Sequence, residues 1–173
     1  MKNILRLSAA ALSIFFAAAS TEASAQATAT ATATATIVTP ISLTKTLDMD
    51  FGNVAVNATS AGTVELTPAG SRVAAGGVTL PATAGSVAAA AFTVDGQANY
   101  TYAITLPTGV HQISNGAVNM NVTGFSSLPS TTGTLDANGT QALTVGATLT
   151  VGAAQPAGIY TSTTPFSVMV NYN

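Results

Sequence analysis

The stretch FSVMVNYN, residues 166–173, decides the fold class. Phe166, Val168, Val170 and Tyr172 occupy every second position, and polar residues fill most of the positions between them. Because successive side chains of a β-strand point to opposite faces of a sheet, this alternation predicts a strand with one buried face. We interpret residues 160–172 as the last strand of a β-sheet, with the four apolar side chains turned toward its core.

Similar short runs, bounded by turn residues, occur throughout the preceding sequence. The Asp95-Gly96 and Asn115-Gly116 pairs are typical of tight hairpins that need a positive φ. No stretch has the period of an amphipathic helix. The pattern predicts an all-β fold, an antiparallel immunoglobulin-like β-sandwich with an extended N-terminal strand arm. The other expected strands are residues 41–47, 49–56, 62–67, 77–80, 88–94, 100–106, 117–125 and 141–151.

The composition is almost free of charge and lacks cysteine and tryptophan, with only 6% of residues charged. Beyond the N-terminal region the basic residues are Lys45 and Arg72 alone. Without a basic patch there is no electrostatic basis for binding nucleic acid or an anionic membrane surface. A free monomer usually carries a charged surface that keeps copies apart. The uncharged Thr, Ser, Asn and Gly surface expected here fits a protein that packs against copies of itself, or one exposed to harsh surroundings in which lysines would be protease sites.

The first residues have the form of a secretory signal peptide. Lys2 and Arg6 precede an apolar run over residues 7–19, which is shorter than the ~20 residues needed to cross a bilayer. The small residues Ala23 and Ala25 fit the −3 and −1 subsites of signal peptidase, so we expect cleavage after Ala25, with cleavage after Ala27 as the alternative. No later run is long and apolar enough to predict an integral membrane segment. The protein is therefore expected to be secreted, at the surface of a Gram-negative-type bacterium or in an extracellular filament, passing through the periplasm.

The segment after the predicted cleavage site is a repeat of Ala-Thr pairs. It covers residues 27–36, continues into Ile37-Val38-Thr39 and stops at Pro40. In an extended chain every Ala lies on one face and every Thr on the other, and the β-branched Thr disfavours a helix. A flexible low-complexity linker is the alternative. We divide the chain into a signal peptide (1–25), an Ala-Thr arm (26–40) and a β-sandwich domain (41–173).

Few residues of the sequence favour catalysis. His111 stands alone in the turn region 107–115, and we interpret it as a surface loop residue. Asp48 and Asp50 could share one strand face, but two carboxylates are too few for a calcium site, and we interpret them as a solvated strand edge near Lys45. We predict no enzymatic activity, no catalytic residues, no cofactor and no metal.

Several stretches carry a resemblance to a known family. They are residues 41–54 with their LDMDFG core, and residues 92–96, 102–107, 145–149, 157–160 and 166–172. Together they resemble the bacterial domain-of-unknown-function family 4402. The resemblance covers most of the chain after the arm, and the family name implies no activity.

The layout is also similar, more loosely, to pilins of the chaperone-usher type, in particular to the cysteine-free major subunit of the common pilus. That resemblance implies a sandwich that lacks its last strand and is completed by an N-terminal extension of the neighbouring subunit. The Ala-Thr arm would be this donor strand. Its alternate side chains would then enter a groove, and they are Ala29, Ala31, Ala33, Ala35 and Ile37.

Taken together, these features predict a secreted structural subunit of a cell-surface pilus or filament that assembles by strand donation from the arm. The expected partners are further copies of the chain in a homopolymer, with a periplasmic chaperone and an outer-membrane usher as assembly factors. The alternative is a monomeric surface or periplasmic adhesive module whose arm folds back onto its own sheet. The two hypotheses differ in whether the arm inserts in trans or in cis.

Overall fold

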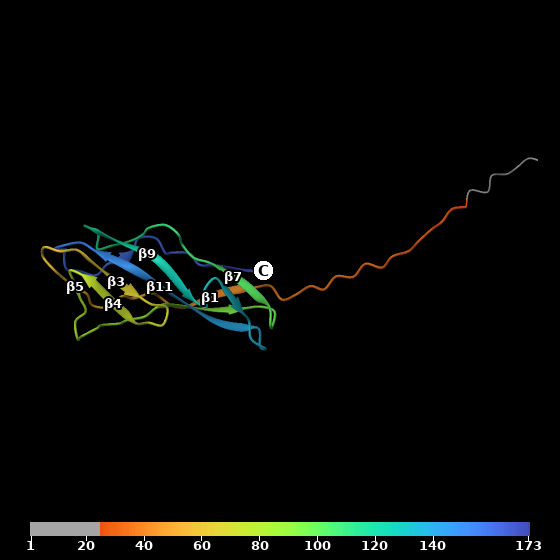
Figure 1. Cartoon of the computed structure of the whole chain (residues 1–173), viewed down its shortest axis with the longest axis horizontal. Helices are drawn as coiled ribbons and strands as arrows, with labels where there is room; N and C mark the ends of the chain where they lie inside the picture. Colours follow the sequence, from red (N-terminus) through yellow and green to blue (C-terminus); the bar gives the residue numbers. More distant parts are fainter. Residues whose placement is uncertain (1–24) are drawn as a thin grey trace, which may run out of the picture. The chain divides into compact units, whose positions relative to one another are not determined.

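The computed structural model describes residues 25–173 (Figure 1). The predicted signal peptide lies outside the described residues except for Ala25. Within the described range the chain forms strands and no helix, and every strand pairing is antiparallel. The strands are β1 (Ser42–Leu47), β2 (Ala55–Val56), β3 (Gly62–Leu66), β4 (Arg72–Gly76), β5 (Val78–Thr79), β6 (Ala90–Asp95), β7 (Thr101–Thr105), β8 (His111–Ser114), β9 (Asn119–Leu128), β10 (Thr132–Thr134), β11 (Thr140–Val151), β12 (Thr161–Ser162) and β13 (Met169–Tyr172).

The long strand β11 organises the main sheet, whose order is β1-β6-β11-β9-β8-β12. One edge of β11 pairs first with β6, through Thr140–Val145, and then with β3, through Ala147–Val151. Its other edge pairs with β9, and β3 continues into β4. Because β6 and β3 share one edge of β11, the two halves of this sheet can cover two separate parts of the core.

Two smaller sheets accompany the main sheet and form a second layer. They are the three-stranded sheet β10-β7-β13 and the two-residue ladder between β2 and β5. The three-stranded sheet packs over one core cluster, centred on Tyr102, Leu135 and Leu143, all fully buried. The other cluster contains Val64 and Leu149 and lies under the β3 half of the sheet. The expected all-β sandwich is confirmed.

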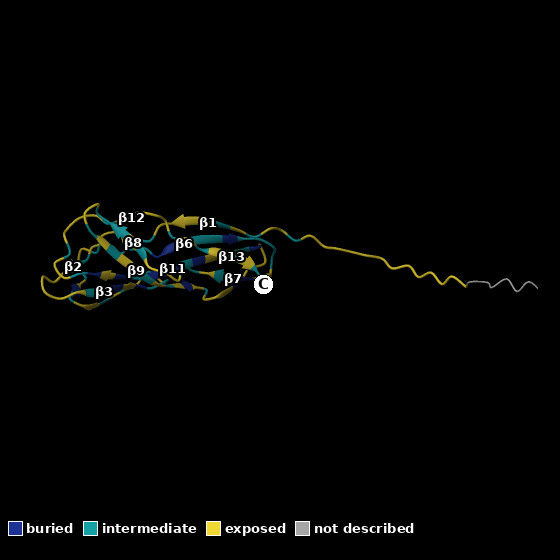
Figure 2. Ribbon diagram, turned by 90° about the horizontal axis from the view of Figure 1, so that it is seen from above, coloured by how far each residue is buried: buried dark blue, intermediate teal, exposed yellow. Residues whose placement is uncertain are grey.

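The core is built from small and β-branched side chains, as the composition requires. Its most buried side chains are mainly Val, Leu and Ala, with Tyr102 as the one aromatic side chain that is fully buried among residues 25–173. Figure 2 shows buried positions along β6 and β11, whereas β1 is mostly exposed. The apolar face of β11 alternates strictly enough that a one-residue slip of register would place Leu143 and Leu149 in solvent.

Several strand predictions need correction. The predicted strand 49–56 is paired only at Asp50, which bridges Ala88, and at β2. The predicted strand 160–172 is two short strands, β12 and β13, separated by six unpaired residues that include Pro165, whose ring cannot donate to a ladder. Sequence patterns did not predict β4, β8 or β10, because these three strands contain many polar or small residues.

The two predicted hairpin glycines have different roles. Gly116 has a φ of +91° in the β8–β9 turn, as predicted. Gly96 does not have a positive φ, so that prediction was wrong. Glycine is needed at this position because two side chains approach its backbone closely. A Cβ atom there would collide with the hydroxyl of Tyr172 and lie 3.0 Å from a methyl carbon of Leu135.

The Ala-Thr repeat of the arm is a unit separate from the β-sandwich domain. Residues 25–36 form a unit of their own in terms of contacts, contain no strand and are all exposed. The second unit begins at Ile37, whose side chain is 95% exposed. The alternation of the arm therefore remains unpaired in the single chain.

Candidate functional site

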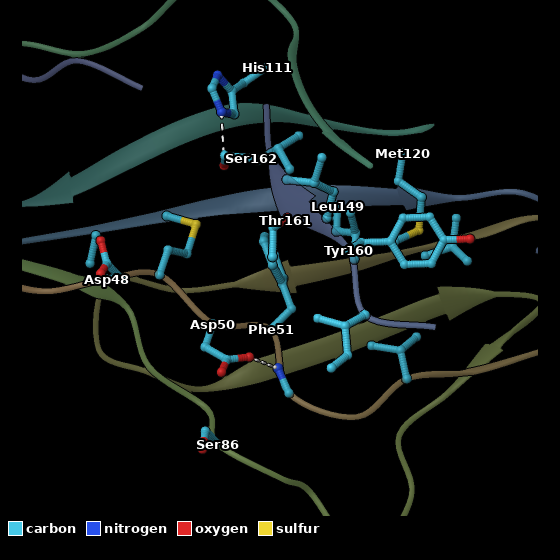
Figure 3. Close-up of a pocket in the computed structure, with 18 of the residues that line it drawn as sticks. Asp48, Asp50, Phe51, Ser86, His111, Met120, Leu149, Tyr160, Thr161 and Ser162 are labelled. Atoms are coloured by element: carbon cyan, nitrogen blue, oxygen red, sulfur yellow. Dashed lines mark hydrogen bonds between the residues drawn. The ribbon is translucent and has the colours of Figure 1, made fainter. Parts of the chain in front are cut away.

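A groove of about 1100 Å³ opens into the domain beside the β3 half of the core. It is lined by side chains of β6, β8, β9 and β11 and by two largely irregular segments, residues 45–56 and 155–166. Figure 3 shows Asp48 and Asp50 on one side of this space and His111 with Ser162 on the opposite side. The groove is a site where apolar side chains of the sheet meet solvent.

Two rows of cross-strand neighbours line the groove with apolar atoms. In the first row Val122 of β9 pairs with Leu149 of β11. In the second, Ile113 of β8 pairs with Met120 of β9. Val122 and Leu149 are almost fully buried, whereas Ile113 and Met120 are only half-buried. Part of the apolar face of the sheet is thus left without a covering strand.

The segment 48–54 borders the groove and is held in place from outside it. The backbone of Asp50 exchanges two hydrogen bonds with Ala88, and Asn53 N–H donates to Ala84 O at 2.7 Å. Arg72 donates from Nη1 to the backbone oxygens of Phe51, at 2.6 Å, and Asn53, at 2.9 Å. These bonds fix one border of the groove.

The segment 155–166 forms the other border. Tyr160 donates a hydrogen bond to Pro156 O at 2.7 Å and accepts one from Gln155 Nε2 at 3.1 Å. Between β12 and β13, residues 163–168 belong to no strand and have no partner in a β-ladder. This stretch is irregular, and its alternation of half-buried and exposed residues from Phe166 continues directly into β13.

The prediction that His111 is a surface loop residue was wrong. His111 begins β8, is half-buried and stands opposite Val122 in the first apolar row. Its Nε2 lies 3.1 Å from Ser162 Oγ, and its ring makes edge contacts with Phe125 and Phe166. His111 thus connects the sheet to the segment 155–166. The flanking polar residues hid this strand from the sequence pattern.

Asp48 and Asp50 both line the groove but make separate contacts. Asp48 Oδ1 accepts from Lys45 Nζ at 2.6 Å, in an exposed ion pair that agrees with the predicted solvated edge near Lys45. Asp50 Oδ1 accepts from the N–H of Gly52 at 2.7 Å. Within residues 25–173 no group of three or more acidic, His or Cys side chains forms a metal-binding cluster.

Across residues 25–173 no helix is long and apolar enough to cross a membrane.

The predicted apolar face of the C-terminal strand is present. Phe166, Val168, Val170 and Tyr172 are each half-buried against the Tyr102 cluster, and the residues between them are exposed. Only Val170 and Tyr172 lie within β13.

The donor residues proposed for the arm are all exposed and lie outside any strand. Their insertion into a groove stays a prediction, as does cleavage after Ala25. The structure brings none of these residues to a site within the described single chain. They are Ala29, Ala31, Ala33, Ala35 and Ile37.

The sequence did not predict the groove itself. Its lining comes from six separated parts of the chain, and Met120 and Ile113 have the same pattern as any core residue. One available indication was Arg72, the only arginine beyond residue 6, which suggests a specific bonding role. Another was the unusually apolar Met49 and Phe51 flanking Asp50.

The fold and the groove define an antiparallel β-sandwich domain with an incompletely covered apolar face. The chain belongs to the family described as Domain of unknown function (DUF4402), whose profile matches residues 41–172. This confirms the family resemblance. Searches of curated proteins and of solved structures found no significant match.

Proposed function

We propose that this protein is a secreted structural subunit of a bacterial surface filament, in which the arm of one copy enters the groove of the next. The observation that carries the proposal is the apolar groove, whose lining includes Pro165 and Phe166 from the segment 163–168 that belongs to no strand. An extended segment with free backbone groups beside an open apolar surface is a template for an added strand.

The mouth of the groove carries apolar side chains that a free surface would not favour. Leu47 is 51% exposed, Ile159 is 85% exposed, and both line the groove. An added strand would cover these side chains together with Met120 and Ile113. Burial of apolar surface is worth about 25 cal/mol per Å², so even a narrow strand would gain several kcal/mol from such contacts.

The arm has the properties that such an added strand needs. Residues 27–38 would span about 40 Å when extended, at ~3.3 Å per residue. Residues 26–40 carry no charged side chain, so inserting them would desolvate no charge. In an extended arm the alanine face would contact the groove, and the threonine face, with its hydroxyl groups, would contact solvent.

The groove and the arm also support the remaining parts of the hypothesis. An exposed groove and a free arm favour a homopolymer, and a periplasmic chaperone would cover the groove until an outer-membrane usher delivers the subunit. The predicted signal at residues 1–25 would supply export to the cell surface. The charged side chains that line the groove are Lys45, Asp48 and Asp50, and His111 is its histidine. On this lining we propose a structural role rather than an enzymatic one.

A truncated variant that starts at Pro40 tests the proposal. We expect the mature chain to form filaments visible by electron microscopy and the truncated chain to remain a monomer in size-exclusion chromatography. A peptide of residues 27–39 should bind the truncated chain. Filaments of the truncated chain would contradict strand donation, and a stable monomer of the intact mature chain would favour the adhesive module with its arm folded back.

A groove variant provides a second test with a matched control. Met120→Glu places a carboxylate on the half-buried groove lining, whereas Asn119→Glu places one at the exposed neighbouring position of β9. We expect peptide binding to be lost in the first variant and kept in the second. Equal binding by both variants would show that the peptide docks elsewhere.

A further inference from the structure

The penultimate residue of the chain is bonded to the base of the arm. The hydroxyl of Tyr172 donates to the backbone oxygen of Thr39 at 2.7 Å and accepts from the N–H of Gln97 at 2.6 Å. Thr39 is 133 residues away in sequence. One hydroxyl group thus joins the last strand, the loop after β6 and the start of the domain.

A second set of bonds closes the same arrangement. The side-chain oxygen of Gln97 accepts from the N–H of Thr39 at 3.2 Å and from its hydroxyl at 3.3 Å. The hydroxyl of Tyr172 can reach this place because residue 96 is glycine, where any Cβ atom would collide with it. We call Thr39, Gln97 and Tyr172 the arm-root clamp. None of the three residues lines the groove.

The position of the clamp matters because Thr39 lies just before the first strand of the domain. β1 begins at Ser42 and pairs with β6 alone, so it is an edge strand with five paired residues. In a filament, tension on the arm would act on the N-terminal end of β1. Without other attachments, its pairs with β6 would open one after another from Ser42. The clamp connects the chain to both layers before β1 begins.

We propose that the arm-root clamp is a mechanical joint that passes tension from the arm into both layers of the sandwich, with Tyr172 as the positioning residue. This inference rests on the proposed function, since only an arm held by another subunit would carry tension. The clamp also fixes the point from which the arm leaves its own domain, because Thr39 is bonded through both its N–H and its carbonyl oxygen.

The test uses Tyr172→Phe in the mature chain, which removes the hydroxyl and keeps the ring. Tyr100→Phe is the matched control, because the Tyr100 ring packs edge-on against Tyr172 at 5.8 Å and its hydroxyl makes no hydrogen bond among the described residues. Amide exchange of Gln97 in the monomer should become about tenfold faster in Tyr172→Phe only. Filaments of Tyr172→Phe should break into shorter pieces under shear that leaves wild-type and Tyr100→Phe filaments intact.

A stability control separates tension from general weakening. Val64→Ala removes fully buried side-chain volume from the core cluster against which Tyr172 does not pack, and its filaments should resist shear despite a lower melting temperature. Binding of the arm peptide to the groove should be unchanged in Tyr172→Phe. Normal peptide binding with fully shear-resistant Tyr172→Phe filaments would overturn the clamp alone. Absence of peptide binding and of filaments in the wild type would overturn the proposed function, and the mechanical role of the clamp with it.

Discussion

The guanidinium group of Arg72 lies 2.6 Å from the backbone oxygen of Phe51. The same Nη1 atom also reaches Asn53 O, so one side chain on β4 holds two carbonyl groups of the segment that borders the groove. These carbonyls belong to residues between the Asp50 bridge and β2, where strand pairing is interrupted. At this point the guanidinium group of Arg72 supplies the hydrogen bonds that a neighbouring strand would otherwise donate.

Replacing Arg72 should therefore damage the groove as well as the fold. Arg72→Met keeps most of the stem but removes the donors, and we expect a loss of about 1–3 kcal/mol in the free energy of unfolding. Affinity for the arm peptide should fall too, because residues 51–53 would shift. Urea unfolding and peptide titration measure the two effects. The control for stability is Lys45→Met, which breaks the exposed pair with Asp48 and should cost less than about 1 kcal/mol. Peptide binding is not compared for this variant, because Lys45 lines the groove.

Ionisation of Tyr102 should limit the stability of the folded protein at alkaline pH. Its side chain is fully buried, its hydroxyl donates to Gln141 Oε1 at 2.7 Å, and burial raises the pKa of the phenol above its usual value near 10. Because the folded pKa is the higher one, this stabilisation is complete below about pH 10 and is lost as the pH rises through the folded pKa.

Tyr102→Phe should lower the free energy of unfolding by about 1 kcal/mol at neutral pH. The variant should also lose stability less steeply than the wild type above about pH 10, since its ring cannot ionise. Denaturant unfolding across this range measures both slopes. Parallel slopes for the two proteins would contradict the assignment.

The sequence predicted the parts of this fold where burial and strand period coincide. Residues 141–151 and 166–172 alternate because one face of each segment packs against the core, and the family resemblance covers the same stretches. β8 was missed because His111, Gln112 and Ser114 are polar, although His111 points into an apolar row. A histidine whose ring packs against two phenylalanines cannot be distinguished in sequence from one in a loop.

The groove could not be predicted for a different reason. It exists where the second layer stops, and that boundary depends on tertiary pairing between segments that are far apart in sequence. Arg72 and Phe51 illustrate this point, since neither residue type indicates the other. The Ala-Thr repeat was easier to recognise, because its strict period of two over residues 27–36 is visible in the sequence itself.

Asp136 should contribute stability that is lost at acidic pH. The N–H of Thr140 and then that of Asn138 donate to its Oδ1, at 2.9 and 2.8 Å, and they hold the pKa of this carboxyl below its usual value. With a lowered folded pKa, the contribution is complete above about pH 3.9 and disappears as the pH falls through the folded value.

Asp136→Asn should therefore be less stable than the wild type near neutral pH, and the difference should shrink below about pH 4. The comparison is made by urea unfolding at several pH values. Asn138→Ala is a useful companion because it removes only a side-chain contact of 3.5 Å and keeps the backbone donors. A difference between Asp136→Asn and the wild type that stays constant down to pH ~2 would exclude this linkage.

The two faces of the arm should differ in their tolerance of charge. If the alanine face enters the groove, Ala31→Asp or Ala33→Asp places a carboxylate among the apolar side chains of the groove lining, where its desolvation would be uncompensated. Thr32→Asp places the same group on the outer face, in water. We expect the arm peptide with Ala31→Asp to bind the truncated domain at least about tenfold more weakly, and the Thr32→Asp peptide to bind almost normally. The opposite order would show that the threonine face is inserted, and equal losses would show that the arm binds without a defined face.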